Sequence, residues 1–132
     1  MDLEDCGENL MPWTYSQSSG LLRSPLGEAI GLGYSGHAAG VNNPALQEVK
    51  DVGPIPQGRW TMGAAVDLPH FGPLVMVLTP DALTDTFSRD GFMIHGDNAA
   101  MDHSASCGCI ILSHEMRAAI AESTDRTLVV TP

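Results

Sequence analysis

The chain has 132 residues, with 16 acidic and only 6 basic side chains, which give a formal net charge of -10 at pH 7. This length suits one domain with a small core. The basic residues are few and scattered, so the sequence excludes nucleic acid as a partner, because phosphate binding relies on clustered Lys and Arg. No apolar run approaches the roughly 18 residues of a membrane span, so we expect no membrane insertion.

The first ten residues read as an acidic, flexible leader, and residues 11–132 as the folded domain. Four acidic side chains and no basic one fall within residues 1–10. Met11 is an alternative natural start, so the sequence leaves open whether the leader belongs to the native protein. The N-terminus lacks a basic segment followed by an apolar one, so we expect no secretory signal and export by another route.

Glycine and proline are frequent, at 14 and 9 residues, and long helical periodicity is scarce, so the chain predicts a β-rich, turn-rich fold. Alternating or continuous apolar runs predict strands over 13–16, 21–23, 29–34, 59–62, 74–79, 92–94 and 127–130. Turn-forming residues predict a turn at 18–20, a loop over 35–44 and a double-proline turn over 53–58.

One helix is expected near the C-terminus. Ser113 is a good N-cap, and the helix is expected to continue through Ser123. Its apolar face consists of Met116, Ala119 and Ile120. We expect this face to pack on the core.

The stretch from Phe92 to Leu112 contains the candidate catalytic residues of the chain. An apolar run ends on His95, and fourteen residues later Cys109 precedes a second apolar run. Pairing of the two runs as strands would bring these side chains face to face. Thiol catalysis needs this arrangement, because a base must take the thiol proton before the thiolate can attack. The sequence therefore predicts Cys109 as a nucleophile and His95 as its base.

The turn before Cys109 supplies a second requirement. Gly108 can adopt backbone angles closed to other residues, so the amides around the thiol can point at a developing oxyanion. The Ser106 hydroxyl is expected to bond the backbone of this turn. Cys107 is expected beside the site, where oxidation with Cys109 would block the nucleophile.

The same stretch resembles the signature of L,D-transpeptidases, bacterial cell-wall enzymes in which His-Gly is followed, after a loop, by Ser/Thr-His-Gly-Cys and an apolar residue. The matching residues here are His95, Gly96, Ser106, Gly108, Cys109 and Ile110. Cys107 stands where the family has a second His, and the interval from His to Cys is slightly short. The first difference leaves either cysteine as the nucleophile, and the position after Gly108 favours Cys109.

Four further motifs extend the resemblance from about Met11 to Val130. They are W-x-Y at 13–15, GYSG at 33–36, NNP at 42–44 and GPIP-x-G at 53–58. Together they are similar to a small L,D-transpeptidase-like subfamily that includes type VI secretion effectors. The resemblance implies a mainly β fold, a sandwich or flattened barrel with the catalytic Cys at the edge of a groove. With the helix predicted above, the fold has one short C-terminal helix.

The activity implied by the resemblance is that of a cysteine-dependent L,D-carboxypeptidase or L,D-transpeptidase on peptidoglycan stem tetrapeptides, without a cofactor. It implies an antibacterial effector that is secreted without a signal peptide and acts in the periplasm of a target bacterium. An immunity protein and a component of the secretion apparatus are the expected partners. Hydrolysis, transpeptidation and D-amino-acid exchange stay open, because water access and acceptor binding decide between them.

Several neighbours of the motif have candidate roles. Either Asp97 or the carbonyl of Gly96 orients the His95 imidazole. Candidate substrate contacts are Tyr34, Asn42, Asn43 and His103. Turn formation explains the two asparagines equally well. His103 is a solvated loop residue in the simpler interpretation and an alternative base in the other.

Two other classes of function remain open from the sequence. The metal-capable residues of the motif are His95, Asp97, His103, Cys107 and Cys109, which together could make a zinc peptidase. The Cys-x-x-Cys and His-x-x-x-His spacings of common zinc sites do not occur, so we expect no metal. A degenerate site would instead leave a peptidoglycan-binding or structural secretion module, whose wall binding would not depend on Cys109.

Overall fold

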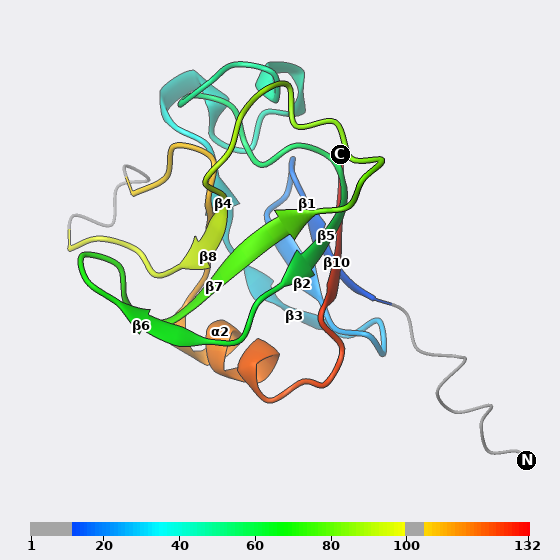
Figure 1. Ribbon diagram of the computed structural model, residues 1–132, viewed down its shortest axis with the longest axis vertical. Helices are drawn as coiled ribbons and strands as arrows, with labels where there is room; N and C mark the ends of the chain where they lie inside the picture. Colours follow the sequence, from blue (N-terminus) through cyan, green and yellow to red (C-terminus); the bar gives the residue numbers. More distant parts are fainter. Residues whose placement is uncertain (1–11, 100–104) are drawn as a thin grey trace, which may run out of the picture.

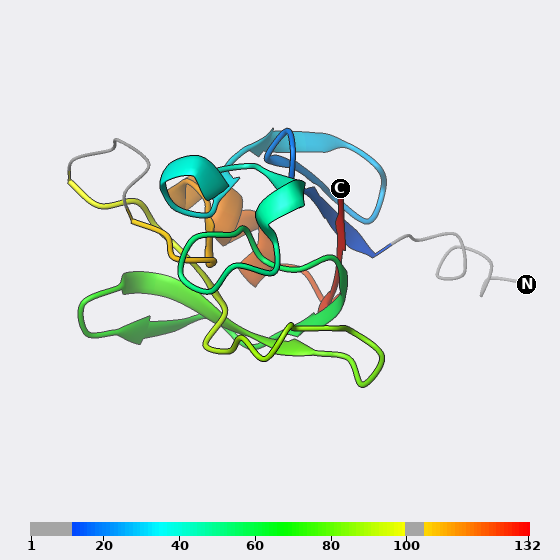
Figure 2. The ribbon, with the colours of Figure 1, turned by 90° about the horizontal axis from the view of Figure 1, so that it is seen from above.

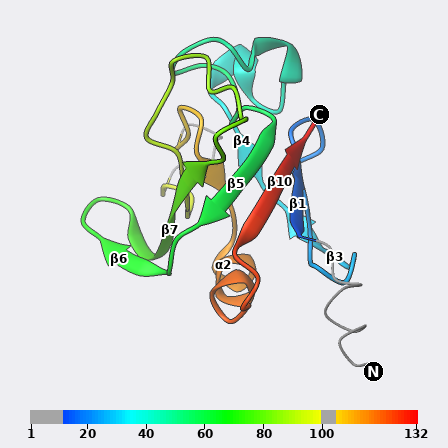
Figure 3. The same ribbon diagram turned by 45° about the vertical axis from the view of Figure 1, so that its right-hand side comes forward.

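In the computed structural model, which describes residues 12–99 and 105–132, ten strands form one strongly curved sheet that nearly closes into a barrel (Figures 1 and 3). The strands are β1 (Trp13–Ser16), β2 (Leu21–Arg23), β3 (Ala29–Leu32), β4 (Tyr34–Ser35), β5 (Gly58–Met62), β6 (Val66–Leu68), β7 (Gly72–Pro80), β8 (Met93–His95), β9 (Ile110–Ile111) and β10 (Thr127–Thr131). The described residues also contain the helix α2 (His114–Ala121) and the 3-10 turns η1 (Ala38–Gly40) and η2 (Pro44–Leu46). The mainly β, barrel-like fold with a short helix near the C-terminus is therefore confirmed.

The sheet curls until its two ends meet. The strand order is β3-β2-β1-β10-β5-β7-β8-β9-β4, and β6 pairs with β7 off this path. β3 and β4 follow each other in the chain but lie at opposite ends of this order, and only Gly33 separates them. Seen from above, β3 and the β6–β7 hairpin lie on opposite sides of the molecule, and β10 lies between them on the right (Figure 2).

Gly33 permits this closure because there is no room for a side chain. Its N–H donates to the carbonyl of Gly20 at 2.7 Å. A Cβ atom at Gly33 would overlap the carbonyl oxygen of Ile111 and the side chain of Leu112. The sequence predicts one continuous strand over 29–34, and this is wrong. The chain breaks at Gly33 because the residues on either side of it pair with different edges of the sheet.

The core fills the inside of the curved sheet. Alternate residues of the strands point inward, as the two-residue period of a strand requires. The fully buried large side chains that the strands contribute to the core are Tyr15, Leu22, Trp60, Met62, Met76, Ile94, Ile110 and Leu128. The Trp60 and Phe92 rings pack edge to face, with centroids 5.2 Å apart. Met116 and Ile120 of α2 complete the core from below in the view of Figure 1, as the apolar face of the helix predicts.

The ends of α2 have clear local causes. The Ser113 hydroxyl accepts from the N–H of Met116 at 3.2 Å, so the predicted N-cap is confirmed. The helix ends at Ala121 and not at the predicted Ser123. The Ser123 hydroxyl accepts from the N–H of Asp125 and from the indole N–H of Trp13, both at 3.1 Å, and these bonds turn the chain toward β10.

Two other segments differ from the sequence prediction. The loop expected over 35–44 begins within β4 and contains η1 and the start of η2. β6 is an additional strand that the sequence does not predict; it forms by pairing with β7, where Val66 lies opposite Val75. Over the described ranges, no helix has the length and apolar character needed to cross a membrane.

The closure predicts a stability difference between two glycines. Gly33→Ala should lower the free energy of unfolding by about 1–3 kcal/mol, because the new methyl group must displace β9 backbone. Gly63→Ala is the matched control, since its Cβ would lie 3.3 Å from the nearest atom, the Val77 carbonyl oxygen. Urea denaturation of both variants measures the difference. Equal losses of stability would contradict the role given to Gly33.

Candidate active site

His95 is the last residue of β8, and Cys109 immediately precedes β9, the parallel neighbour of β8. The register of β8 and β9 pairs Ile94 with Ile110 and His95 with Ile111. Ile94 and Ile110 point into the core, so His95 and Cys109, which are one residue away from them, share the outer face of the sheet. They are diagonal neighbours across the parallel pair, because His95 lies directly opposite Ile111. No hydrogen bond joins the two side chains in the described parts of the chain.

The imidazole of His95 is held in one tautomer. Its Nδ1 lies 2.8 Å from the carbonyl oxygen of Gly96. A carbonyl oxygen can only accept, so Nδ1 carries the proton and Nε2 has a free lone pair. Of the two candidate orienting groups, the structure therefore brings the Gly96 carbonyl, and not the Asp97 carboxylate, to the ring.

The environment of His95 favours its neutral form. The side chain is only 5% exposed, and the Phe71 ring packs against it with centroids 5.0 Å apart. Burial lowers the pKa of His95, and the positive charge of Arg117 lowers it further, against smaller opposing effects of the Gly96 carbonyl and Asp97. Nε2 is thus unprotonated at neutral pH and can act as a base.

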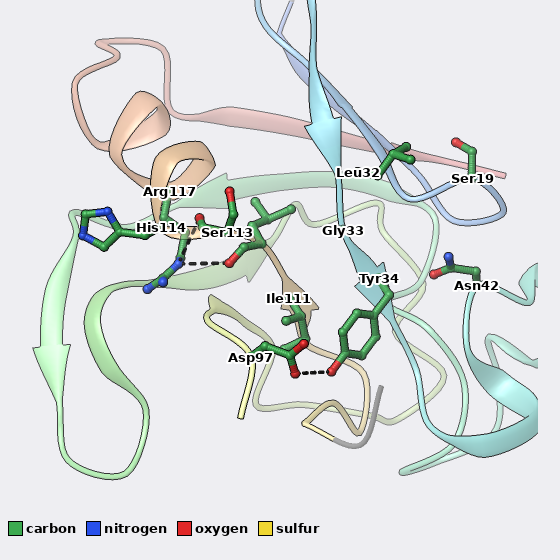
Figure 4. A pocket seen from close by; sticks show the side chains of 11 residues that line it. Ser19, Leu32, Gly33, Tyr34, Asn42, Asp97, Ile111, Ser113, His114 and Arg117 are labelled. Atoms are coloured by element: carbon green, nitrogen blue, oxygen red, sulfur yellow. Dashed lines mark hydrogen bonds between the residues drawn. The ribbon is translucent and has the colours of Figure 1, made fainter. Parts of the chain in front are cut away.

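Asp97 has a different role in this geometry. Its Oδ1 accepts from the Tyr34 hydroxyl at 2.8 Å and from the N–H of Asn98 at 2.9 Å (Figure 4). The Tyr34 hydroxyl also accepts from the N–H of Ala105 at 3.2 Å. Tyr34 therefore ties both sides of the connection between β8 and β9 to strand β4.

The Cys109 thiol rests as a neutral group. Its sulfur lies 3.7 Å from the carbonyl oxygen of Gly91. Burial raises the pKa of Cys109, and this outweighs the N–H of Met93 and the charge of Arg89, which both lower it. Together with the neutral imidazole, this describes a thiol and a base before proton transfer, not a preformed ion pair.

Two buried hydroxyls hold the turn that carries the thiol. The Ser106 hydroxyl donates to the carbonyl of Cys109 at 2.6 Å and accepts from the N–H groups of Gly36 at 3.0 Å and Gly108 at 2.9 Å. The Ser35 hydroxyl donates to the carbonyl of Gly108 at 3.0 Å. Both serines are completely buried. The backbone from 106 to 109 is therefore fixed from the inner side.

The same bonds decide which amides are free. The N–H of Gly108 is used by Ser106, although the sequence proposes it for an oxyanion. The N–H groups of Cys107 and Cys109 have no acceptor among the residues that the structure describes. Both cysteines are free thiols, with Cys107 exposed. An oxyanion site at this turn would thus use the amides that flank Gly108.

Arg89 supports this turn and was missed by the sequence analysis. Its guanidinium donates to the carbonyls of Gln47, Pro54, Gly53 and Cys107, at 2.6 to 3.3 Å. It also lies over the Phe92 ring, 5.1 Å from the centroid. Gly108, at φ +137°, passes so close that a Cβ there would lie 2.5 Å from Arg89 Nη2. A lone Arg shortly before the His95 strand was the only signal in the sequence.

Two cavities border the site. The larger, of about 650 Å³, is lined by Ser19, Leu32, Gly33, Tyr34, Asn42, Asp97, Ile111, Leu112, Ser113, His114 and Arg117 (Figure 4). The smaller, of about 260 Å³, is lined by His70, Phe71, His95, Gly96, Asp97, Asn98 and Ala105. Asp97 lines both cavities, whereas His95 lines only the smaller one and Cys109 lines neither. Arg117 and Phe71 were not proposed from the sequence, because neither lies near the motif in the chain.

The candidate substrate contacts fall into three groups. Tyr34 and Asn42 line the larger cavity. Asn43 instead caps η2, accepting from the N–H of Ala45 at 3.2 Å and donating to the carbonyl of Ala39 at 3.1 Å, which is the turn-forming role. His103 lies outside the described residues, as do the leader and Cys6. Over residues 12–99 and 105–132, no three His, Cys, Asp or Glu side chains converge as metal ligands do.

The nearly closed, mainly β barrel is the fold that the L,D-transpeptidase-like signature predicts. Residues 31–131 match the family model of the Tlde1 domain, and the chain belongs to this family, which consists of type VI secretion effectors of the L,D-transpeptidase-like class. The family relationship makes the protein an effector that acts on target cells. No curated protein shows significant similarity to the chain.

The neutral resting pair predicts the pH dependence of thiol alkylation. In a Cys6→Ser, Cys107→Ser variant, the rate of Cys109 alkylation by iodoacetamide should rise with pH, with a midpoint above that of a free thiol in an unstructured peptide. Burial is the cause, because it disfavours the thiolate. Mass spectrometry measures the rate at each pH. A rate already at its maximum near pH 6 would show a preformed thiolate and imidazolium instead.

Proposed function

We propose that the protein is a cysteine-dependent L,D-carboxypeptidase or L,D-transpeptidase that acts on peptidoglycan stem tetrapeptides. The observation that carries the proposal is the placement of His95 and Cys109 on one face of adjacent strands. The hydrogen bond from Nδ1 to the Gly96 carbonyl supports it, because it leaves Nε2 as a base. Membership of the Tlde1 domain family supports the class of reaction.

The first half of the reaction forms a thioester. When the substrate binds, Nε2 of His95 takes the proton of Cys109, and the sulfur attacks the carbonyl of the L,D bond before the terminal D-Ala. The N–H groups of Cys107 and Cys109 stabilise the oxyanion that forms. The protonated His95 then gives its proton to the D-Ala amine, the carbon–nitrogen bond breaks, and D-Ala leaves.

In the second half, His95 activates the acceptor. Water attack on the thioester gives a tripeptide and completes an L,D-carboxypeptidase cycle. Attack by an amine gives transpeptidation or D-amino-acid exchange. In each case Nε2 takes a proton from the acceptor, and the Cys109 thiol is restored.

The neutral resting pair fits this sequence of steps. A buried ion pair would require two desolvated charges before the substrate arrives. Here the charges form only during attack, when the oxyanion site and the substrate surround them. Phe71 and the segment after His95 keep the imidazole largely out of water until then.

In this proposal, each of the two cavities binds a different part of the substrate. The larger cavity, with Tyr34 and Asn42 in its wall, has the volume for the acyl part of the stem peptide. The smaller one borders His95 and has the volume for the departing D-Ala or an incoming amine. The site of action is the periplasm of a target bacterium. An immunity protein and a component of the secretion apparatus are the partners that this role requires.

The nucleophile assignment is tested by two cysteine variants. Cys109→Ala should abolish turnover of purified tetrapeptide muropeptides, followed by mass spectrometry, because no other sulfur occupies the position after Gly108. Cys107→Ser should keep most of the activity. His95→Gln should reduce turnover by several orders of magnitude while the melting temperature changes little. Loss of activity in Cys107→Ser with retention in Cys109→Ala would reverse the assignment.

The same variants separate an enzyme from a binding module. A module would retain wall binding in Cys109→Ala, and the unmodified protein would give no new muropeptide products.

The compartment of action is tested in living cells. Expression in the cytoplasm of a Gram-negative bacterium should be tolerated, because the substrate bond lies outside the cytoplasmic membrane. Fusion to a periplasmic export signal should slow growth or swell the cells, as tetrapeptide donors are consumed. Growth curves and microscopy measure the effect, with exported Cys109→Ala as the control. Equal toxicity of the cytoplasmic form would mean that mature cell wall is not the target.

A further inference from the structure

The larger cavity contains a buried positive charge that the proposed chemistry does not use. Arg117 of α2 is only 7% exposed, yet it lines this cavity. Its Nε donates to the carbonyls of Leu112 and Ser113, and its Nη1 to that of Pro73 (Figure 4 shows the first two bonds). All three acceptors are neutral, and no carboxylate forms an ion pair with Arg117 within the described ranges.

One end of the guanidinium remains free. Nη2 makes no hydrogen bond in the part of the chain that the structure describes, and it lies against Gly96, where a Cβ would be 2.7 Å away. A buried charge is normally paired, because leaving it unpaired is costly. The free donor next to a cavity therefore points to an anionic group that comes from a ligand.

The surroundings of Arg117 favour the same kind of ligand. His114 lies at the first position of α2 and lines the cavity together with Ser113. The N–H groups of His114 and Glu115 have no acceptor among the described residues, so the start of the helix adds donors directed at the same end. The basic side chains of the cavity wall, His114 and Arg117, both belong to α2, and Asp97 stands elsewhere in the wall. The protein as a whole carries a charge of -10, so an anionic ligand must be held by such local contacts.

We propose that Arg117 and the start of α2 bind a free carboxylate of the stem peptide, on the acyl side of the attacked bond. This rests on the proposed function, and it names a feature of the substrate that the reaction itself does not require. Ser113 is four residue steps after Cys109, which is about 13 Å of extended chain. In the stem peptide, the carboxylate of the second residue and the side-chain carboxylate of the third residue lie six to eight bonds from the attacked carbonyl. This corresponds to about 8–10 Å. The Arg117 and Cys109 side chains are long enough to make up the difference between this distance and the length of extended chain.

The terminal D-Ala carboxylate does not fit this position. It belongs to the leaving group, which the proposed function places in the smaller cavity, and Arg117 lines only the larger one. The proposal therefore predicts that the affinity depends on which carboxylate of the peptide is charged, and not on the total negative charge of the peptide.

Binding to the inactive Cys109→Ala protein tests this directly by calorimetry. Four synthetic tetrapeptides are compared: the unmodified one, and ones amidated at the second residue, at the third side chain or at the terminal D-Ala. Amidation at one of the first two positions should weaken binding by about tenfold or more, because a charge-assisted hydrogen bond is lost. Amidation of the terminal D-Ala should change the dissociation constant by less than about threefold. The two acyl-side peptides identify which carboxylate is bound.

Two variants in the same Cys109→Ala background test the protein side. Arg117→Gln should bind the unmodified and the sensitive amidated peptide equally well, while Arg59→Gln, an exposed arginine of β5, controls for the loss of one positive charge. Thermal melting shows whether Arg117→Gln folds. If it does not, the comparison of peptides decides alone. Equal binding of all four peptides, or equal losses from both arginine variants, would overturn the proposal.

Turnover by the unmodified protein separates the two proposals. Turnover of the tetrapeptide together with equal binding of all amidated forms would leave the proposed function standing and remove only the carboxylate site. Absence of both turnover and binding for every peptide would overturn the proposed function and this inference with it.

Discussion

Closure of the sheet at Gly33 is the constraint on which the site depends. A single residue without a side chain lets the chain pass from one edge of the sheet to the other, against the carbonyl of Ile111. The two residues that follow are then delivered next to β9. Tyr34 ties Asp97 and Ala105 to β4, and Ser35 holds the carbonyl of Gly108. The barrel and the site are thus completed by the same contact, so a change that opens the sheet also releases both sides of the β8–β9 connection.

The site combines a rigid backbone with side chains that are not yet charged. Ser106, Ser35 and Arg89 satisfy the backbone of the turn from the buried side, which leaves only the outward amides available. Rigid support of this kind keeps catalytic groups in place without help from the substrate. In contrast, burial favours the neutral forms of both Cys109 and His95. In the proposed reaction, the positions of the groups are therefore set in advance, and charge separates only when a substrate is present.

The few basic residues of this acidic chain mainly donate hydrogen bonds to backbone carbonyl groups. Arg89, Arg117 and Arg126 donate to carbonyl groups from several segments and stabilise turns that no regular pairing satisfies. Arg89 and Arg117 are also buried next to the site, and burial lowers the pKa of each. An arginine nevertheless keeps its charge in a protein. Positive charge is consequently concentrated where the substrate is proposed to bind, on a surface that is otherwise strongly acidic.

The sequence by itself determined the local features. Alternation of apolar residues located most strands, and Ser113 marked the start of α2. The Phe92–Leu112 stretch predicted that the apolar runs next to His95 and Cys109 pair as strands. Tertiary structure alone decided the features that depend on distant partners. The break at Gly33 follows from contact with Ile111, Arg89 finds its acceptors on segments up to 42 residues away, and Arg117 reaches Gly96 only because α2 packs below the sheet. Local patterns predict which backbone conformation a residue prefers, but cavities, burial and close approaches arise between segments that the sequence does not show side by side.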